Sequence, residues 1–93
     1  MTQHTISLGT SSNTTPESVN HGDTITFQND EGIVIYLTLP TIFTENPSSP
    51  VQLGIGASAG PYTVDGTSSG DFVYSWDDES QKRNTYNGHI DIN

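Results

Sequence analysis

Residues 70–76 read Gly-Asp-Phe-Val-Tyr-Ser-Trp, and this stretch decides the fold class. Aromatic side chains stand at every second position, at Phe72, Tyr74 and Trp76. Side chains two positions apart point to the same face of a β-strand, so the pattern predicts a strand with one buried, aromatic face. The glycine in front of it is a typical turn residue. The fold therefore has to be built around half-buried strands of this kind.

The same alternation continues along the chain, between short turns rich in Gly, Pro, Asn and Asp. The run from Ile33 to Leu39 is the most apolar, so we expect it to be central and buried on both faces. At most two short helical turns are expected, around 42–45 and 78–83. The predicted strands are residues 4–8, a brief one at 19, and 24–29, 33–39, 51–55, 61–64, 70–76 and 88–92. Seven or eight short strands at this spacing predict an all-β, two-sheet Greek-key sandwich.

Length and charge limit the organisation and the partners. The 93 residues correspond to a single domain, 1–93. Eleven acidic residues face only two basic ones, Lys82 and Arg83, which gives a formal net charge of −9. A field of this sign repels phosphate groups, so we expect no nucleic acid and no membrane among the partners. The chain has no cysteine, which excludes disulfides, thiolate metal sites and cysteine catalysis.

The N-terminal sequence carries no targeting signal. Met1 to His4 contains neither a basic segment nor an apolar run, and no later stretch approaches the ~18 apolar residues that span a membrane. We expect a cytoplasmic protein. A processed secreted domain would give the same pattern, so that alternative stays open.

Three blocks together resemble the cupredoxin family, the sandwich of the plastocyanin and azurin type. Gly22 to Asn29 resembles the strand that leads into the first copper-ligand loop, and Gly70 to Trp76 resembles the strand that leads into the second. Gly88 to Ile92 resembles the closing strand. Their order and spacing fit the family over nearly the whole chain. The resemblance implies a cupredoxin-like sandwich for residues 1–93.

The copper ligands of that family are absent. A blue-copper site needs two imidazoles, one thiolate and a weak axial ligand. The resemblance places these positions at Ile35, Trp76, Glu79 and Asn84, and none of them is His, Cys or Met. We therefore expect no cofactor and no electron transfer. The four positions become candidates for binding a ligand or partner instead. For Trp76 two roles stay open: an indole that fills the vacated volume, or a ring that stacks on a ligand.

Other chemistry-bearing residues are sparse. Asp77, Asp78 and Glu79 form the densest carboxylate run and are candidate calcium ligands, although the spaced calcium-loop motif is missing. The same run also suits the start of a short helical turn. His4 and His89 lie on terminal strands and could form a two-histidine metal site if those strands were neighbours. Asn13-Thr14-Thr15 matches the glycosylation sequon.

These observations predict a metal-free cupredoxin-like binding or interaction module that is not an enzyme. No nucleophile–base pair, phosphate-binding loop or other catalytic constellation is present in the sequence. Its partner would be a protein or a small ligand. Two alternatives remain: a calcium-binding or other acidic-site protein, and a structural protein that self-associates through its sheet edges.

Overall fold

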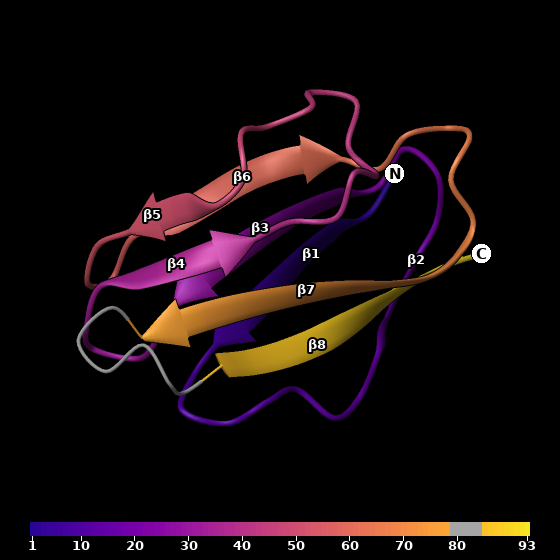
Figure 1. Ribbon diagram of the computed structural model, residues 1–93. Coiled ribbons are helices and arrows are strands. Elements are labelled where there is room, and N and C mark those ends of the chain that lie inside the picture. Colours follow the sequence, from indigo (N-terminus) through magenta and orange to yellow (C-terminus); the bar gives the residue numbers. More distant parts are fainter. Residues whose placement is uncertain (79–84) are drawn as a thin grey trace.

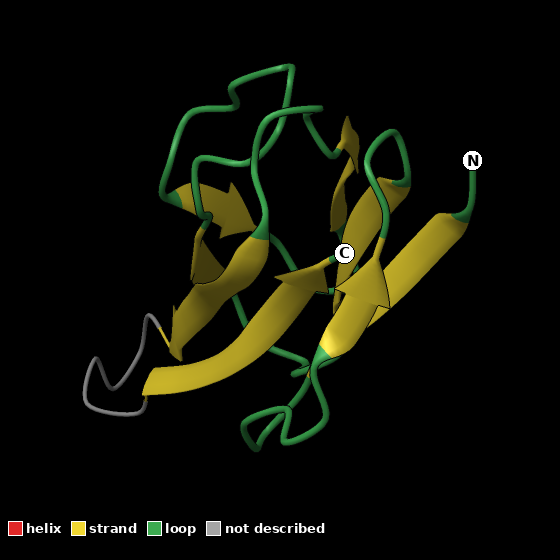
Figure 2. Ribbon diagram, turned by 90° about the vertical axis from the view of Figure 1, so that its right-hand side faces the viewer, coloured by secondary structure: helices red, strands yellow, loops and turns green. Residues whose placement is uncertain are grey.

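The computed structural model describes residues 1–78 and 85–93 (Figure 1). The described residues form eight strands and no helix (Figure 2), so the predicted all-β class is confirmed. The strands are β1 (Gln3–Leu8), β2 (Glu17–Val19), β3 (Thr24–Asn29), β4 (Ile35–Thr38), β5 (Val51–Leu53), β6 (Ser58–Thr63), β7 (Gly70–Asp78) and β8 (Thr85–Ile92).

The strands form two sheets that pack as a sandwich. One sheet has three strands in the order β1-β3-β6, and the other has five in the order β2-β8-β7-β4-β5. Two pairings are parallel, β1 with β3 and β2 with β8, and the remaining ones are antiparallel. Because successive strands cross between the sheets, β1 and β2 each end up as the edge strand of a different sheet. This arrangement positions the candidate site described below.

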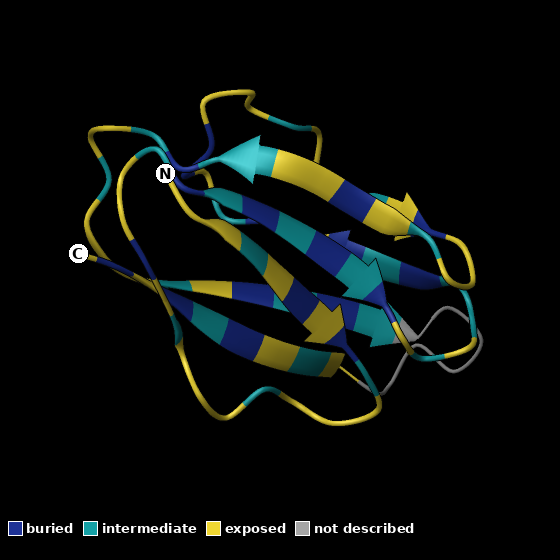
Figure 3. Cartoon of the chain, turned by 180° about the vertical axis from the view of Figure 1, so that it is seen from behind, coloured by how far each residue is buried: buried dark blue, intermediate teal, exposed yellow. Residues whose placement is uncertain are grey.

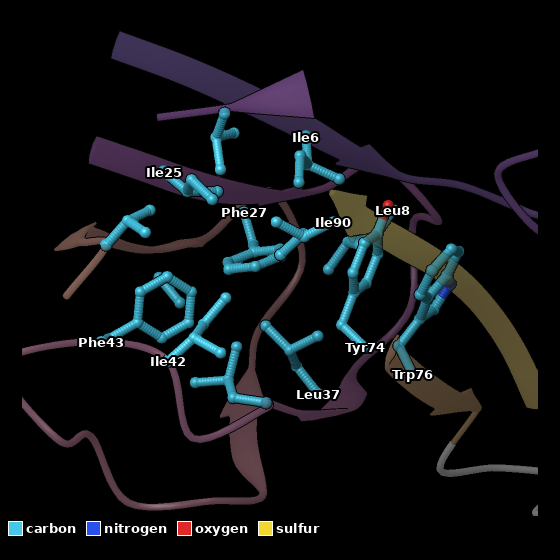
Figure 4. Close-up of a cluster of buried hydrophobic side chains, with 14 of the residues drawn as sticks. Ile6, Leu8, Ile25, Phe27, Leu37, Ile42, Phe43, Tyr74, Trp76 and Ile90 are labelled. Carbon is cyan, nitrogen blue, oxygen red and sulfur yellow. The ribbon is translucent and has the colours of Figure 1, made fainter. Parts of the chain in front are cut away.

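The core lies between the two sheets and takes one face of each strand (Figure 3). Tyr74 and Trp76 are buried and Phe72 is partly buried against them, which confirms the aromatic face predicted for residues 70–76. The predicted inward positions of Ile90 and Ile92 are confirmed as well. Figure 4 shows how side chains from both sheets interdigitate. Each fully buried side chain of this size stabilises the fold by about 1.5–3 kcal/mol.

The prediction that β4 is buried on both faces was wrong. The strand does lie centrally, paired with β5 on one side and β7 on the other. Its faces differ, however: Ile35 and Leu37 are buried, whereas Tyr36 is half-buried and Thr38 is exposed. No further layer covers the outer face of the five-stranded sheet among the described residues, so an apolar run here does not mean burial on both sides.

Strand β6 begins earlier than predicted and contains a proline. Pro61 is tolerated because β6 is an edge strand that pairs only with β3. Gly60 stands at an irregularity in that pairing, with a φ of +110°. A β carbon there would lie 2.6 Å from the Ile25 carbonyl oxygen, so only glycine fits. Strand β5 ends at Leu53, two residues before the predicted end at Ile55.

The first expected helical turn is absent, and the second lies outside the described residues. Residues 44–45 form a turn, and Phe43 makes an isolated antiparallel bridge with Val64. Ile42 and Phe43 are both buried, because this connection covers one end of the core (Figure 4). Of the second segment, Asp78 is the last residue of β7, and residues 79–84 are not described.

Candidate functional site

The edge strands β1 and β2 belong to different sheets and are joined by a side-chain contact between His4 and Glu17, and we call this junction the seam. His4 lies on the inward side of β1, the side that also carries Ile6 and Leu8. Glu17 lies on the inward side of β2, two residues before the buried Val19. The seam is therefore closed by a polar pair where the core pattern would place two apolar side chains.

His4 bridges two carboxylates. Its Nδ1 lies 2.9 Å from Glu17 Oε2, and its Nε2 lies 2.9 Å from Asp23 Oδ2. Carboxylates only accept hydrogen bonds, so the ring satisfies both contacts only when both nitrogens carry a proton, as in the imidazolium. Burial disfavours that charge, but the hydrogen bonds to Asp23 and Glu17 outweigh it. The pKa of His4 is accordingly raised above 6.5.

Asp23 anchors this cluster to the N-terminal end of β1. It is buried, and its carboxylate accepts hydrogen bonds from the backbone N–H groups of Asn20 and Thr2 as well as from His4. The Asn20 N–H makes the largest contribution to lowering the pKa of Asp23 to about 2, followed by the bonds from His4 and Thr2. Asp23 is therefore ionised over the whole neutral range and holds His4 in place.

A pocket opens beside this cluster, and we call it the seam pocket. Its volume is about 360 Å³, and it lies between β1 and the segment that leads into β2. Ile6 and Tyr74 are its buried members and so form its floor, while the more exposed residues form its walls. Its lining residues are Thr5, Ile6, Ser7, Ser12, Asn13, Thr14, Thr15, Glu17 and Tyr74.

The outer wall of the seam pocket is tied to both sheets. The backbone N–H of Asn13 donates to the Asn87 carbonyl of β8 (2.9 Å), and the Asn87 N–H donates to Ser12 Oγ (3.0 Å). The Asn13 side-chain amide donates to the Ser7 carbonyl of β1 (3.1 Å) and to the Tyr74 hydroxyl (2.8 Å). Four hydrogen bonds thus position an otherwise irregular segment.

These bonds change the interpretation of the glycosylation sequon. Modification of Asn13 needs a free side-chain nitrogen, but this nitrogen donates to two acceptors in the folded chain. One of these, Tyr74, lies on the pocket floor, where burial raises the pKa of its hydroxyl despite the bond from Asn13. Asn13 therefore acts as a structural part of the pocket.

Several polar groups of the pocket are left over for a ligand. The hydroxyls of Thr5, Thr14 and Thr15 take part in no hydrogen bond within residues 1–78 and 85–93. Glu17 bonds His4 through Oε2 only, which leaves Oε1 as an acceptor. The Tyr74 oxygen accepts from Asn13 and keeps its own O–H as a donor. The pocket thus offers both donors and acceptors.

The structure buries two of the four positions that the cupredoxin resemblance singled out. Ile35 and Trp76 have no exposed surface, so neither side chain can reach a partner from outside. Trp76 donates from Nε1 to the Gly9 carbonyl (3.0 Å), stacks on Tyr74 with ring centroids 5.9 Å apart, and packs against Tyr86. Figure 4 shows the indole next to the Tyr74 ring. Glu79 and Asn84 lie outside the described residues.

Of the three predicted calcium candidates, Asp77 alone has a described side chain. Asp77 accepts a hydrogen bond from the Thr85 hydroxyl, and Glu79 is not described. Residues 1–78 and 85–93 contain no group of three or more His, Asp or Glu side chains that could hold an ion. Calcium binding by the run Asp77, Asp78 and Glu79 stays a prediction.

The condition for a two-histidine site, that the strands of His4 and His89 are neighbours, is not met. Strand β1 pairs with β3, and β8 pairs with β2 and β7 in the other sheet. His89 instead contacts Asp71 of β7, with 2.8 Å between Nδ1 and Oδ2, in an exposed pair. The two histidines therefore have separate carboxylate partners.

Sequence reasoning missed Glu17 and Asp23 as partners of His4. The available signal was the position of Glu17 two residues before Val19, which places a carboxylate on an inward face.

Comparisons with protein-family models and with curated proteins found no match to this chain. No helix of a length and apolarity suited to crossing a membrane occurs in the described ranges.

Proposed function

We propose that the protein is a metal-free, cupredoxin-like binding module that is not an enzyme, and that it binds a small ligand in the seam pocket. The two-sheet sandwich of eight strands supports the scaffold. The absence of cysteine from the sequence removes the thiolate that a blue-copper site requires, which supports a role other than electron transfer.

One observation carries the proposal: the seam pocket keeps unused hydrogen-bonding groups on walls that the fold holds in place. Small-molecule sites have volumes of about 300–1,000 Å³ and a few fixed polar groups. The seam pocket falls at the lower end of this range. Its wall is fixed by bonds to β1 and β8, while three threonine hydroxyls have no hydrogen-bond partner among residues 1–78 and 85–93. Groups fixed before binding reduce the entropic cost of binding.

The remaining candidate surfaces give less support. The buried side chains of Ile35 and Trp76 offer no surface of their own to a partner. Self-association through the edge strands stays a prediction as well. Strand β6, one of these edges, carries Pro61 and an irregular register, which are features that discourage edge-to-edge pairing.

A binding screen by NMR tests the proposal. The ¹⁵N–¹H spectrum of the protein is recorded against a mixed set of small metabolites, and we expect saturable shifts at residues 5–7 and 12–17. Thr5→Phe fills the pocket mouth from an exposed strand position that favours aromatic residues, so it should abolish those shifts. Thr38→Phe places the same ring on the exposed face of β4 and serves as the matched control. Ligands that shift other residues only would contradict the proposal.

A further inference from the structure

We infer that the seam pocket takes a neutral, hydroxyl-rich molecule about the size of a single sugar ring. This inference rests on the proposed function and names its ligand class. The first argument comes from the free groups. Thr5, Thr14 and Thr15 each offer a hydroxyl that both donates and accepts, which matches a ligand whose own groups are hydroxyls. The floor adds a donor at Tyr74 and an apolar contact at Ile6.

The charge of the pocket argues against an anion. No lysine or arginine is among its lining residues within 1–78 and 85–93, and the chain carries a formal charge of −9. Both basic residues of the sequence, Lys82 and Arg83, lie outside the described residues. A phosphate or carboxylate ligand would meet the carboxylate of Glu17 on a chain of strongly negative net charge, and such a like charge disfavours binding.

The charge of the pocket also argues against a cation. Glu17 is the one carboxylate among the lining residues, and His4 already holds its Oε2. With both ring nitrogens bonded to carboxylates, His4 acts as the internal counter-ion of Glu17. A cationic ligand would have to share a carboxylate that already accepts a hydrogen bond from an imidazolium. Glu17 Oε1 can still accept a hydrogen bond from a neutral hydroxyl.

The size of the pocket matches a ligand of one ring. A volume of about 360 Å³ lies close to the lower bound of small-molecule sites. The segment 12–13 is fastened to β8 and to β1, so the wall is not free to move outward for a longer chain. The site therefore suits a monosaccharide or a cyclic polyol.

A titration with three classes of probe tests this inference. The full chain is titrated at pH 6 with glucose and myo-inositol as neutral polyols, with putrescine as the cation and with inorganic phosphate as the anion, each followed by NMR. We expect saturable shifts at residues 5–7 and 12–17 with at least one polyol, and none there with putrescine or phosphate.

Two variants identify the groups responsible. Thr14→Val/Thr15→Val removes two hydroxyls without changing side-chain shape, and we expect about a tenfold or greater loss of polyol affinity, since each hydrogen bond contributes about 0.5–1.5 kcal/mol. Thr38→Val is the matched control and should leave the affinity unchanged. Glu17→Gln keeps an oxygen acceptor and should change polyol affinity less than about threefold, whereas a bound cation would lose much more.

The outcomes separate the two proposals. Shifts at the pocket by putrescine or phosphate, with none by a polyol, would overturn the inferred ligand class and leave the binding function in place. Polyol affinity that survives the double valine variant would also overturn the inference. If no probe of any class shifts residues 5–7 and 12–17, both the ligand class and the proposed function are wrong.

Discussion

The ring of Tyr74 lies directly against Gly88 on the neighbouring strand. The two residues are register partners between β7 and β8, and a β carbon at position 88 would lie 2.2 Å from the Tyr74 hydroxyl oxygen. Glycine thus makes room for the ring that forms the floor of the seam pocket. The side chain absent at residue 88 is what allows Tyr74 to reach Asn13.

Gly88→Ala should therefore destabilise the protein through overpacking. The added methyl group forces the Tyr74 ring to move and breaks its hydrogen bond to Asn13, so we expect a loss of at least about 2 kcal/mol in the free energy of unfolding. Urea denaturation measures the loss. Gly66→Ala is the control, because nothing lies within 4 Å of a β carbon there and its stability should stay within about 0.5 kcal/mol of the parent. Equal stabilities for the two variants would contradict the packing argument.

The single tryptophan reports on the burial of position 76, which the cupredoxin resemblance aligns with a copper ligand. Trp76 has no exposed surface and its Nε1 donates to the Gly9 carbonyl. We expect a blue-shifted emission spectrum and little quenching by acrylamide in the folded protein. Trp76→Phe should cost about 2 kcal/mol, because it leaves a cavity and an unpaired carbonyl oxygen. Efficient quenching in the native state would mean that the indole is accessible to ligands after all.

Asn29 is the buried polar residue that joins two loops, so its replacement should be costly. Its amide nitrogen donates to the carbonyls of Ile33, Leu53 and Gly54, and its Oδ1 accepts from the Glu31 backbone N–H. Asn29→Asp has nearly the same volume but faces carbonyl oxygens with a carboxylate. We expect a loss of at least about 3 kcal/mol at pH 7.

Calorimetry at two pH values tests this interpretation of Asn29. Protonation of an aspartate at residue 29 restores a donor, so the deficit should shrink as the pH falls. Asn20→Asp offers a comparison at an exposed turn position and should show a much smaller deficit. A deficit for Asn29→Asp that is independent of pH would argue against a charged, buried carboxylate as its cause.

The His4 bridge makes stability depend on pH. The pKa of His4 is raised in the folded state, opposed by burial but driven by Asp23 and Glu17, the two carboxylates that face it. This stabilisation is complete below the unfolded pKa near 6.5 and is lost as the pH rises through the raised, folded pKa. We expect the thermal midpoint of unfolding to decrease as the pH is raised from 6 to 9. Calorimetry at constant ionic strength measures this decrease.

Two variants test whether this pH step, the loss of thermal stability with rising pH, comes from His4. His4→Gln should lose the pH step, while Asp71→Asn should keep it, because Asp71 faces His89 on the other sheet. Asp23 contributes in the opposite direction: its pKa of about 2 means that its stabilisation is present above about 3.8 and is lost as the pH falls through about 2. A step of unchanged size in His4→Gln would assign the titration to another group.

Most of the strand positions could be predicted from the sequence, because alternation is a local signal. Strand β3 has the predicted bounds, and the aromatic face of β7 follows directly from Phe72, Tyr74 and Trp76. The outer face of β4 could not be predicted in the same way. An apolar side chain reveals its preference for burial, but whether a second layer exists depends on the number of elements in the fold.

The candidate site was much less predictable than the strands. Its contacts join residues far apart in the sequence: Asn13 with Tyr74, and His4 with Glu17 and Asp23. Alternation assigns each residue to a face but does not name its partner across the seam. His4 was therefore considered only as a conditional partner of His89, and Asn13 drew attention only as a sequon.

The place of β8 in its sheet has a consequence for the order of folding during synthesis. Strand β8 lies between β2 and β7, with Glu17 opposite Ile90 and Val19 opposite Ile92. A nascent chain that still lacks these residues has no hydrogen-bonded neighbour for β2 and no inner wall for residues 12–13. The three-stranded sheet can assemble before β8 has been synthesised, but the five-stranded sheet cannot be completed until β8 is available. Pairing across more than seventy residues is entropically slow, so we expect this late step to set the folding rate.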